Sequence, residues 1–189
     1  MTADANPPAR KAQLRTACIA ARDGVGREAR AAAATRLFAR MMDVRGRTIA
    51  GYLPIGSEAD PRGTMAVLSR ANRICVPVVT ARGAPLRFRE WWPGCPLEVG
   101  AFGVSVPVEG GWRVPDILIA PLVGFDAGCG RLGYGGGFYD RTLAGLRDAQ
   151  AIGLAFEAQR VDSIPREATD MPLDAVITEA RVYLPPAAR

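Results

Sequence analysis

A nearly continuous apolar segment, followed at once by a cluster of glycines, most constrains the fold of this chain. Residues 116–123 read DILIAPLV, and seven glycines lie within the next fourteen residues, 124–137. An apolar run without polar alternation is typical of a strand that is buried on both faces of a sheet. A helix is expected from about residue 138 to residue 146. This order of strand, glycine-rich loop and helix is typical of α/β proteins.

The remainder of the chain shows the same alternation of strands and helices. Capping residues such as Asn6 and apolar residues at helical spacing predict helices over about residues 7–22, 27–42 and 60–73. Short apolar runs predict strands over residues 48–53, 74–79, 86–91, 151–156 and 175–178, whereas the Pro/Gly-rich residues 93–111 read mostly as loop. We therefore expect one domain, residues 1–189, with a parallel-rich sheet and helices on both faces.

Ligands of such sheets bind beyond the carboxyl ends of the strands, which directs attention to residues 54–58 and 124–137. Glycines let backbone N–H groups turn toward one point, and the following helix adds partial positive charge at its N-terminus. We expect an anion site here, most simply for phosphate. Arg131 can add a bidentate contact, and Asp140, in the first turn of the helix, can hold a hydrated Mg²⁺ against the phosphates.

Two known glycine patterns fit this segment poorly. Gly128 to Gly133 matches the dinucleotide pattern G-x-G-x-x-G, and Glu157 falls near the acidic position expected after the next strand. That pattern normally opens a domain on a tight strand-to-helix turn, however, and little chain follows here. The Walker pattern fails, because Gly136 and Gly137 stand where lysine and serine or threonine are required.

Composition narrows the chemistry and the setting. The chain contains no histidine, which excludes every mechanism that needs an imidazole. Its four cysteines form no Cys-x-x-Cys pair, as is typical of a reduced compartment. No secretion signal and no apolar run long enough to cross a bilayer is recognised. We expect a cytoplasmic protein that acts away from membranes.

The positive charge is supplied almost entirely by arginine. The net charge is +5 and, of the 24 basic residues, Lys11 is the single lysine. On a helix, Lys11, Arg15 and Arg22 fall on one face, and Leu14, Ala17 and Ala21 form a separate apolar stripe. Such a basic face is usually solvated. The lone lysine on it favours a phosphate contact instead, because a compact ammonium suits phosphate.

Several motifs together resemble the 5-formyltetrahydrofolate cyclo-ligase (methenyltetrahydrofolate synthetase) family. The most specific is Arg131-Leu-Gly-Tyr-Gly-Gly-Gly-Phe-Tyr-Asp140. The other matching positions, weak singly, are Lys11-Ala-Gln-Leu-Arg15, Glu58, Gln159, Asp170 and Leu173-Asp-Ala-Val-Ile-Thr178. The resemblance spans nearly the whole chain and implies a three-layer α/β/α, Rossmann-like fold with a mostly parallel central sheet. It also implies the conversion of 5-formyltetrahydrofolate and ATP, with Mg²⁺, to 5,10-methenyltetrahydrofolate, ADP and phosphate.

The resemblance assigns roles by position. Lys11 and Arg131 would be catalytic. The ATP contacts would be Lys11, Arg15, Arg131, Leu132, Gly133, Tyr134, Gly135, Gly136, Gly137, Phe138 and Tyr139. The folate contacts would be Glu58, Phe102, Tyr134, Gly135, Gly136, Gly137 and Phe138, and the magnesium ligands would be Asp140 and Asp170. The chain departs from the family at Phe138, in place of the first tyrosine of Tyr-Tyr-Asp, at Thr169, where many relatives have histidine, and at Val106, where a glutamate often precedes Pro107.

The sequence leaves rival functions open. A related ATP-dependent enzyme could act on another formylated or carboxylated compound, because the departures lie on the folate side. A non-catalytic nucleotide- or RNA-binding protein would suit the excess of arginine, but these arginines are scattered and no basic motif interleaved with aromatic residues is present. We therefore expect a monomer that acts on a small molecule and does not bind nucleic acid.

Overall fold

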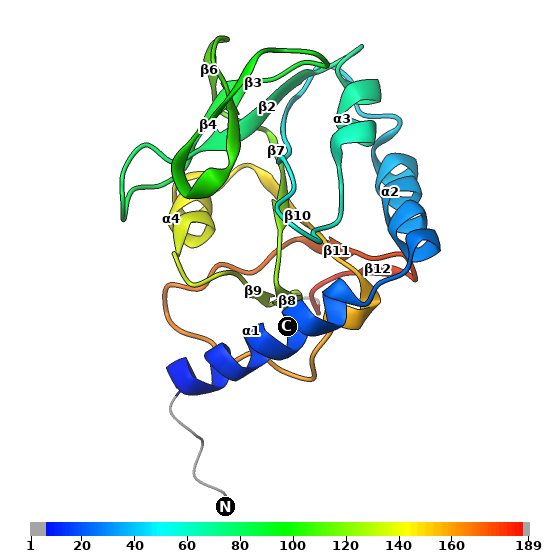
Figure 1. Cartoon of the computed structure of the whole chain (residues 1–189), viewed down its shortest axis with the longest axis vertical. Coiled ribbons are helices and arrows are strands. Elements are labelled where there is room, and N and C mark those ends of the chain that lie inside the picture. Colours follow the sequence, from blue (N-terminus) through cyan, green and yellow to red (C-terminus); the bar gives the residue numbers. More distant parts are fainter. Residues whose placement is uncertain (1–6, 187–189) are drawn as a thin grey trace, which may run out of the picture.

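The computed structural model describes residues 7–186, which form a large sheet with helices around it (Figure 1). The strands are β1 (Thr48–Ala50), β2 (Arg73–Val78), β3 (Arg87–Glu90), β4 (Leu97–Val99), β5 (Ser105–Pro107), β6 (Trp112–Arg113), β7 (Ile117–Pro121), β8 (Gly124–Phe125), β9 (Arg131–Leu132), β10 (Gln150–Leu154), β11 (Ala175–Ile177) and β12 (Val182–Tyr183). The main sheet has the order β12-β11-β10-β7-β1-β2-β3-β6. Its inner strands, from β11 to β2, are parallel, and its edges are antiparallel. The expected mostly parallel sheet is confirmed.

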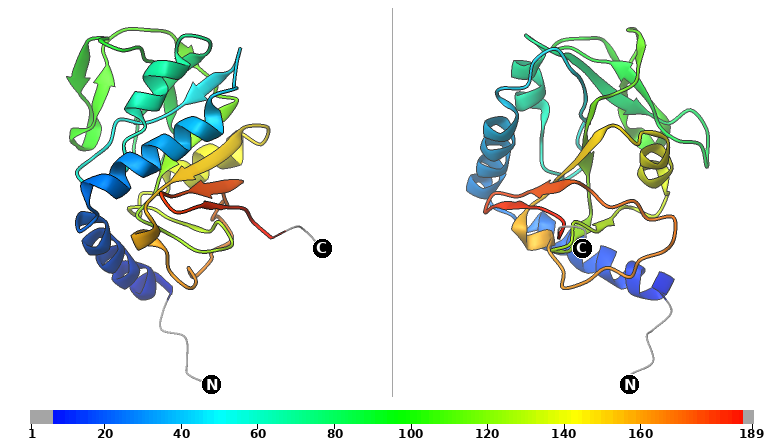
Figure 2. Two further views of the ribbon diagram at one scale, coloured as in Figure 1. Left: turned by 90° about the vertical axis from the view of Figure 1, so that its right-hand side faces the viewer. Right: turned by 180° about the vertical axis from the view of Figure 1, so that it is seen from behind.

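Helices cover both faces of this sheet and give the three-layer arrangement that the resemblance implied. The α-helices are α1 (Pro7–Asp23), α2 (Arg27–Met41), α3 (Arg62–Leu68) and α4 (Phe138–Gly145). Helices α2 and α3 lie on one face, and α4 lies on the other (Figures 1 and 2). Along β7, Ile117 and Ile119 pack into the core under α2 and α3, whereas Leu118 and Ala120 pack into the core under α4. The strand is buried on both faces, as its sequence predicts.

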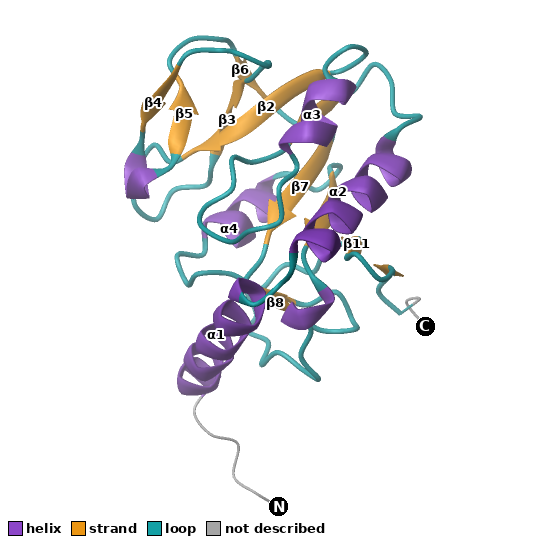
Figure 3. Ribbon diagram, turned by 45° about the vertical axis from the view of Figure 1, so that its right-hand side comes forward, coloured by secondary structure: helices purple, strands orange, loops and turns teal. Residues whose placement is uncertain are grey.

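Helix α1 lies outside the three layers, beyond the carboxyl end of β7 (Figure 3). It packs against the small β8–β9 hairpin, where Leu14 meets Leu132 and Ile164. The apolar stripe expected on this helix is wrong in part, because Ala17 and Ala21 are exposed.

The buried face of α1 consists instead of Leu14 and Cys18 flanked by Lys11 and Arg22. The basic face therefore points into the protein rather than into solvent. This is possible because acidic and hydroxyl groups meet each buried cation, so that charge is not buried alone.

The first half of the glycine-rich segment forms the β8–β9 hairpin rather than an open loop, and one carboxylate organises it. The buried Asp126 accepts hydrogen bonds from the backbone N–H groups of Gly128 at 3.0 Å, Gly130 at 2.8 Å and Ile164 at 3.2 Å. A Cβ on Gly130 would lie 2.7 Å from Oδ2 of Asp126, so this position requires glycine. The hairpin fixes where the second half of the segment begins.

Two predicted boundaries and one expected loop differ most from the structure. The third helix ends at Leu68 rather than near residue 73, because the Asn72 side chain donates to the Leu68 carbonyl at 3.0 Å and β2 starts directly afterwards. Pairing of the first strand ends at Ala50 rather than at residue 53. Residues 93–111, expected to be mostly loop, contain the β4–β5 hairpin, with the short 3-10 helix η1 (Ala101–Gly103) at its tip. Glycines with positive φ, such as Gly103, make this turn possible. The sequence did not predict the hairpin, because a segment rich in glycine and proline reads as loop.

The expected cap Asn6 lies outside the described residues. Between residues 7 and 186, no helix has both the length and the apolar character needed to cross a membrane.

Replacing Asp126 tests the hairpin. Asp126→Ala leaves the buried N–H groups of Gly130 and Ile164 without their acceptor, so we expect the free energy of unfolding to fall by about 2–4 kcal/mol. Urea denaturation measures this change, with Asp148→Ala as a control, because Asp148 is exposed. A loss no greater than that of the control would contradict the role assigned to Asp126.

Candidate active site

The glycine loop, defined here as residues 133–137, connects β9 to α4. Gly135 and Gly137 have positive φ angles of 98° and 63°, and Gly137 is the N-cap of α4. Among residues 7–186, no hydrogen bond uses a backbone N–H of the glycine loop as donor. These N–H groups lie at or near the surface and remain available for an anion at the N-terminus of the helix.

Helix α1 brings Arg15 to this loop and Lys11 to the segment that carries Asp170, two contacts that the sequence left open. Nε of Arg15 donates to the carbonyl of Gly133 at 2.8 Å. Nζ of Lys11, whose side chain is 10% exposed, donates to Asp170 at 2.8 Å and lies 3.2 Å from Glu167. Burial alone lowers the pKa of Lys11, but the two carboxylates outweigh it and raise the pKa, so the ammonium stays charged.

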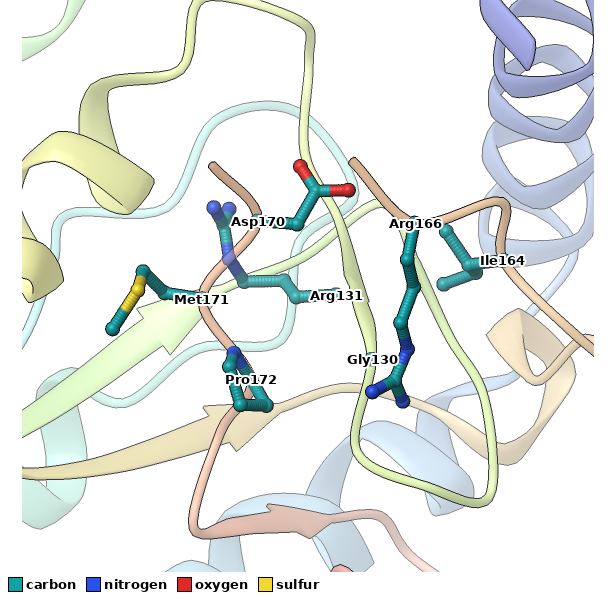
Figure 4. Close-up of a pocket in the computed structure, with 7 residues that line it drawn as sticks. All are labelled: Gly130, Arg131, Ile164, Arg166, Asp170, Met171 and Pro172. Atoms are coloured by element: carbon teal, nitrogen blue, oxygen red, sulfur yellow. The ribbon is translucent and has the colours of Figure 1, made fainter. Parts of the chain in front are cut away.

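Arg131 is a second largely buried cation, and its partner is Asp140 in the first turn of α4. Nη2 of Arg131 donates to Oδ1 of Asp140 at 2.7 Å, and the guanidinium carbon lies 5.4 Å from the centre of the Tyr139 ring. The Arg131 side chain is only 4% exposed, and its Nε has no hydrogen-bond partner among the described residues. Arg131 also lines a small pocket with Asp170, Met171 and other residues (Figure 4).

The two expected magnesium ligands are both occupied by cations in this structure. Asp140 uses Oδ1 for Arg131, and Asp170 uses Oδ2 for Lys11. Within residues 7–186, no hydrogen bond uses the other oxygen of either carboxylate. The same residues contain no group of three or more acidic, histidine or cysteine side chains that could hold a metal. The pair still suits Mg²⁺, which often binds through one or two carboxylates and completes its shell with phosphate oxygens and water.

The residues expected to contact folate approach the glycine loop from another side. The side chain of Glu58 is only 3% exposed; its Oε1 accepts from the Tyr134 hydroxyl at 3.1 Å and its Oε2 accepts from the backbone N–H of Ile55 at 2.9 Å. Burial is the largest influence on this carboxyl group and raises its pKa above the ordinary value.

Phe102 reaches the loop from the tip of the β4–β5 hairpin. It has a positive φ of 57°, is largely exposed, and packs edge-on against Phe138, with ring centroids 5.9 Å apart. The exposed ring of Phe102 and the half-buried ring of Phe138 offer an apolar wall for a planar heterocycle, and the buried carboxylate of Glu58, bonded to Tyr134 of the loop, offers a polar contact.

Two other expected positions contribute differently. The side chain of Leu132 is buried in the contact with α1, so only its backbone can face a ligand. The ring of Tyr139 packs into the core under α4 and supports Arg131 from behind.

The dinucleotide pattern does not have the required structure. Gly128 and Gly130 lie in the turn of the β8–β9 hairpin, and Gly133 follows β9, so no strand-to-helix turn is formed there. Cys129 within this turn is fully buried, and burial raises the pKa of its thiol, so it is poorly placed for alkylation.

The sequence did not single out Glu167, which pairs with Lys11, or Arg166, whose guanidinium lies 3.7 Å from Asp126. The only available signal was their closeness in sequence to Asp170.

Comparisons with known proteins, by sequence and by fold, point to one family. The 5-formyltetrahydrofolate cyclo-ligase family matches residues 7–179. The 5-formyltetrahydrofolate cyclo-ligase of Escherichia coli strain K12 is 36% identical over 160 residues, covering 80% of this chain and 88% of that protein. The enzyme of the same name from Mycolicibacterium smegmatis is 33% identical over 198 residues, covering 92% and 96%. The structure of Aquifex aeolicus 5,10-methenyltetrahydrofolate synthetase superposes with a TM-score of 0.79 at 28% identity, covering 95% and 94%.

The fold and the site define an α/β protein whose glycine loop, with Arg15 against it and its backbone N–H groups unpaired among residues 7–186, lies beyond the carboxyl ends of its strands. With the comparisons, this class narrows to one family of ligases. The chain belongs to the 5-formyltetrahydrofolate cyclo-ligase family.

The Lys11–Asp170 pair predicts a specific pH dependence of stability. Burial raises the pKa of Asp170, but hydrogen bonds from Lys11 and the Glu167 N–H outweigh it and hold the pKa below the ordinary 3.8. Because the pKa of Asp170 is lower in the folded protein than in the unfolded chain, the pair stabilises the fold fully at pH values above 3.8. This contribution disappears as the pH falls through the pKa that Asp170 has in the folded protein. We therefore expect Asp170→Asn to lower the free energy of unfolding at neutral pH and to differ less from wild type in acid.

Urea denaturation of wild type and Asp170→Asn, at neutral pH and at a pH below the ordinary pKa of the carboxyl group, measures the loss of stability under each condition. Asp148→Asn is the control, because Asp148 is exposed. An equal deficit at neutral and acidic pH would show that the ionised carboxylate of Asp170 does not stabilise the fold through Lys11.

Proposed function

We propose that this protein converts 5-formyltetrahydrofolate to 5,10-methenyltetrahydrofolate, with ATP and Mg²⁺ as co-substrate and cofactor. One observation carries the proposal beyond the family name: the glycine loop is contacted by the cation Arg15 at Gly133 and by the carboxylate of Glu58 at Tyr134. The pairs Arg131–Asp140 and Lys11–Asp170 add two more cations and two carboxylates around it. A phosphate-binding surface and a site for a planar ring thus share residues 133–137.

The chemistry suits a chain without histidine. The N5-formyl oxygen attacks the γ-phosphorus of ATP, the bond to the bridging oxygen breaks, and ADP leaves. N10 then attacks the activated formyl carbon and loses its proton to solvent, and the carbon–oxygen bond breaks to release phosphate as the ring closes. Phosphoryl transfer depends on positioning and charge neutralisation more than on a strong base.

The residues of this chain can supply both requirements. Lys11, Arg15 and Arg131 bind phosphate oxygens and offset the negative charge that develops on them, together with the glycine-loop N–H groups. Asp140 and Asp170 would hold Mg²⁺, which neutralises and orients the phosphates when bound. Each carboxylate already pairs with a cation of the site. The cations that would bind the phosphates of ATP and the carboxylates that would hold the metal are therefore in place before either arrives.

A direct assay tests the proposed function. Purified protein is mixed with 5-formyltetrahydrofolate and MgATP, and the absorbance of the methenyl product is followed together with ADP release. We expect equal amounts of both products and no reaction without ATP or Mg²⁺. Turnover of ATP without methenyl product would contradict this substrate and favour a different formylated or carboxylated compound.

Removing the ammonium of Lys11 tests its part in phosphoryl transfer. Loss of an electrostatic stabiliser typically costs about 10²-fold or more in kcat, so Lys11→Ala should fall by at least this factor. Arg10→Ala is the matched control, because Arg10 is a neighbouring cation on the exposed side of α1. Turnover of Lys11→Ala near that of the control would reject the role.

Asp140→Asn tests the metal site. Mutation of a residue that only supports a metal ligand typically lowers metal affinity by about 10-fold or more. Loss of a ligand itself should therefore raise the Mg²⁺ concentration that gives half-maximal rate by at least this factor. A Mg²⁺ titration of activity measures the change, with Asp148→Asn as control, and an unchanged midpoint would count against Asp140 as a ligand.

A further inference from the structure

Arg22, the third cation on the basic face of α1, is almost wholly buried beside the glycine loop. Its side chain is 5% exposed. Nε donates to the Ser57 hydroxyl at 3.0 Å, and Nη2 donates to the Tyr134 hydroxyl at 3.0 Å. Its remaining nitrogen, Nη1, has no hydrogen-bond partner among the described residues. A buried guanidinium N–H without an acceptor is costly, and native proteins seldom leave one without a reason.

The neighbouring carboxylate does not supply the missing acceptor. Oε1 of Glu58 lies 3.9 Å from Nη1 of Arg22, beyond hydrogen-bond distance. Both carboxylate oxygens already accept other hydrogen bonds, from Tyr134 and from the N–H of Ile55. A nearby cation, Arg30, is by contrast fully engaged, because it donates to the carbonyls of Val25, Ser57 and Arg22.

The Tyr134 hydroxyl lies between Arg22 and Glu58. It accepts from Arg22 and donates to Glu58 at the same time. Tyr134 belongs to the glycine loop and is 53% exposed, so its side chain can move away into solvent. A ligand that takes its place must offer an acceptor to Arg22 and a donor to Glu58, side by side.

Resting on the proposed function, we propose that Arg22 is a further folate-binding residue, which pairs with Glu58 to recognise the adjacent carbonyl oxygen and N–H of the pteridine ring. Arg22 donates to the carbonyl oxygen, and Glu58 accepts from the N–H. The Tyr134 hydroxyl holds this position in the free protein and leaves it when folate binds, which frees Nη2 of Arg22 for the carbonyl oxygen. Nη1, which has no partner among the described residues, is a second donor for a ligand oxygen.

The charge of Arg22 supports this arrangement. Burial raises the pKa of Glu58, and the N–H of Ile55, Tyr134 and the Arg22 charge counteract the rise. Glu58 must be ionised to accept from the ring, so removal of the Arg22 charge should move the pH at which folate binding is gained to a higher value. A purely structural role for Arg22 would not shift this midpoint.

Equilibrium titration of the full chain with 5-formyltetrahydrofolate, without ATP, tests the proposal. Loss of a hydrogen bond to a charged group should raise the Kd of Arg22→Met by about 10- to 100-fold. The Kd for MgATP should stay at the wild-type value. Arg22→Lys keeps the charge near Glu58 without the forked donors, and should show an intermediate Kd and an unshifted pH midpoint.

A second ligand and a matched variant separate the alternatives. Tetrahydrofolate has the same ring edge but no formyl group, so the loss in Arg22→Met should be equally large for it. A loss confined to the formylated ligand would overturn the proposal in favour of the formyl oxygen. Arg30 donates to the carbonyl of Ser57, in the loop of residues 54–58 that Arg22 also contacts. Arg30→Lys alters the anchoring of this loop without removing Arg22, so it should bind folate more tightly than Arg22→Met.

Further results would also overturn the proposal. These are an unchanged folate Kd in folded Arg22→Met, or equal losses for folate and MgATP. If Arg22→Met does not fold, Arg22→Lys carries the test, and wild-type folate affinity in that variant would overturn the proposal. Failure of the proposed function itself is distinct, because the wild-type protein would then neither bind nor convert 5-formyltetrahydrofolate.

Discussion

Two ion pairs beyond the carboxyl end of β7, Lys11–Asp170 and Arg131–Asp140, are the interactions on which the site depends. Both cations are largely buried, and a buried charge without a partner would be too costly to keep. The carboxylates make it possible to hold these cations at this end of the sheet before any ligand arrives. Both cations are therefore in place before the phosphates arrive, and they can exchange their carboxylate partners for phosphate oxygens.

The fold explains how distant segments meet at this place. Strand β7 ends at the hairpin that Asp126 organises, and the hairpin delivers the chain to the glycine loop and α4. Helix α1 crosses the same end of the sheet and is held there by the contact of Leu14 with Leu132. Its cationic face thus meets the loop and the segment that carries Asp170. The last turn of the same helix carries Arg22, which lies on the side of the loop where Glu58 and Tyr134 lie.

Local patterns predicted the parts of this arrangement that depend on local structure. The apolar run of β7, the glycine loop and Asp140 in the first turn of α4 all follow from residues close together in the chain. The Lys11–Asp170 contact joins residues 159 positions apart, so no spacing rule could reveal it. The family resemblance, rather than periodicity, brought these two residues into one site.

Other features were hidden for physical reasons. A single aspartate in a glycine-rich stretch reads as loop, although Asp126 turns that stretch into a hairpin. The basic face of α1 was expected to be separate from its apolar stripe, because helix patterns assign charge to solvent. Only the tertiary partners of Lys11 and Arg22 show that this face is buried.

The most direct measurement is the structure of the protein with Mg²⁺ and a non-hydrolysable ATP analogue. The account predicts phosphate oxygens on the N–H groups of residues 133–137, with Nζ of Lys11 and the guanidinium of Arg131 turned from their carboxylates toward the phosphates. A nucleotide bound elsewhere, with the Lys11–Asp170 and Arg131–Asp140 pairs intact, would contradict it.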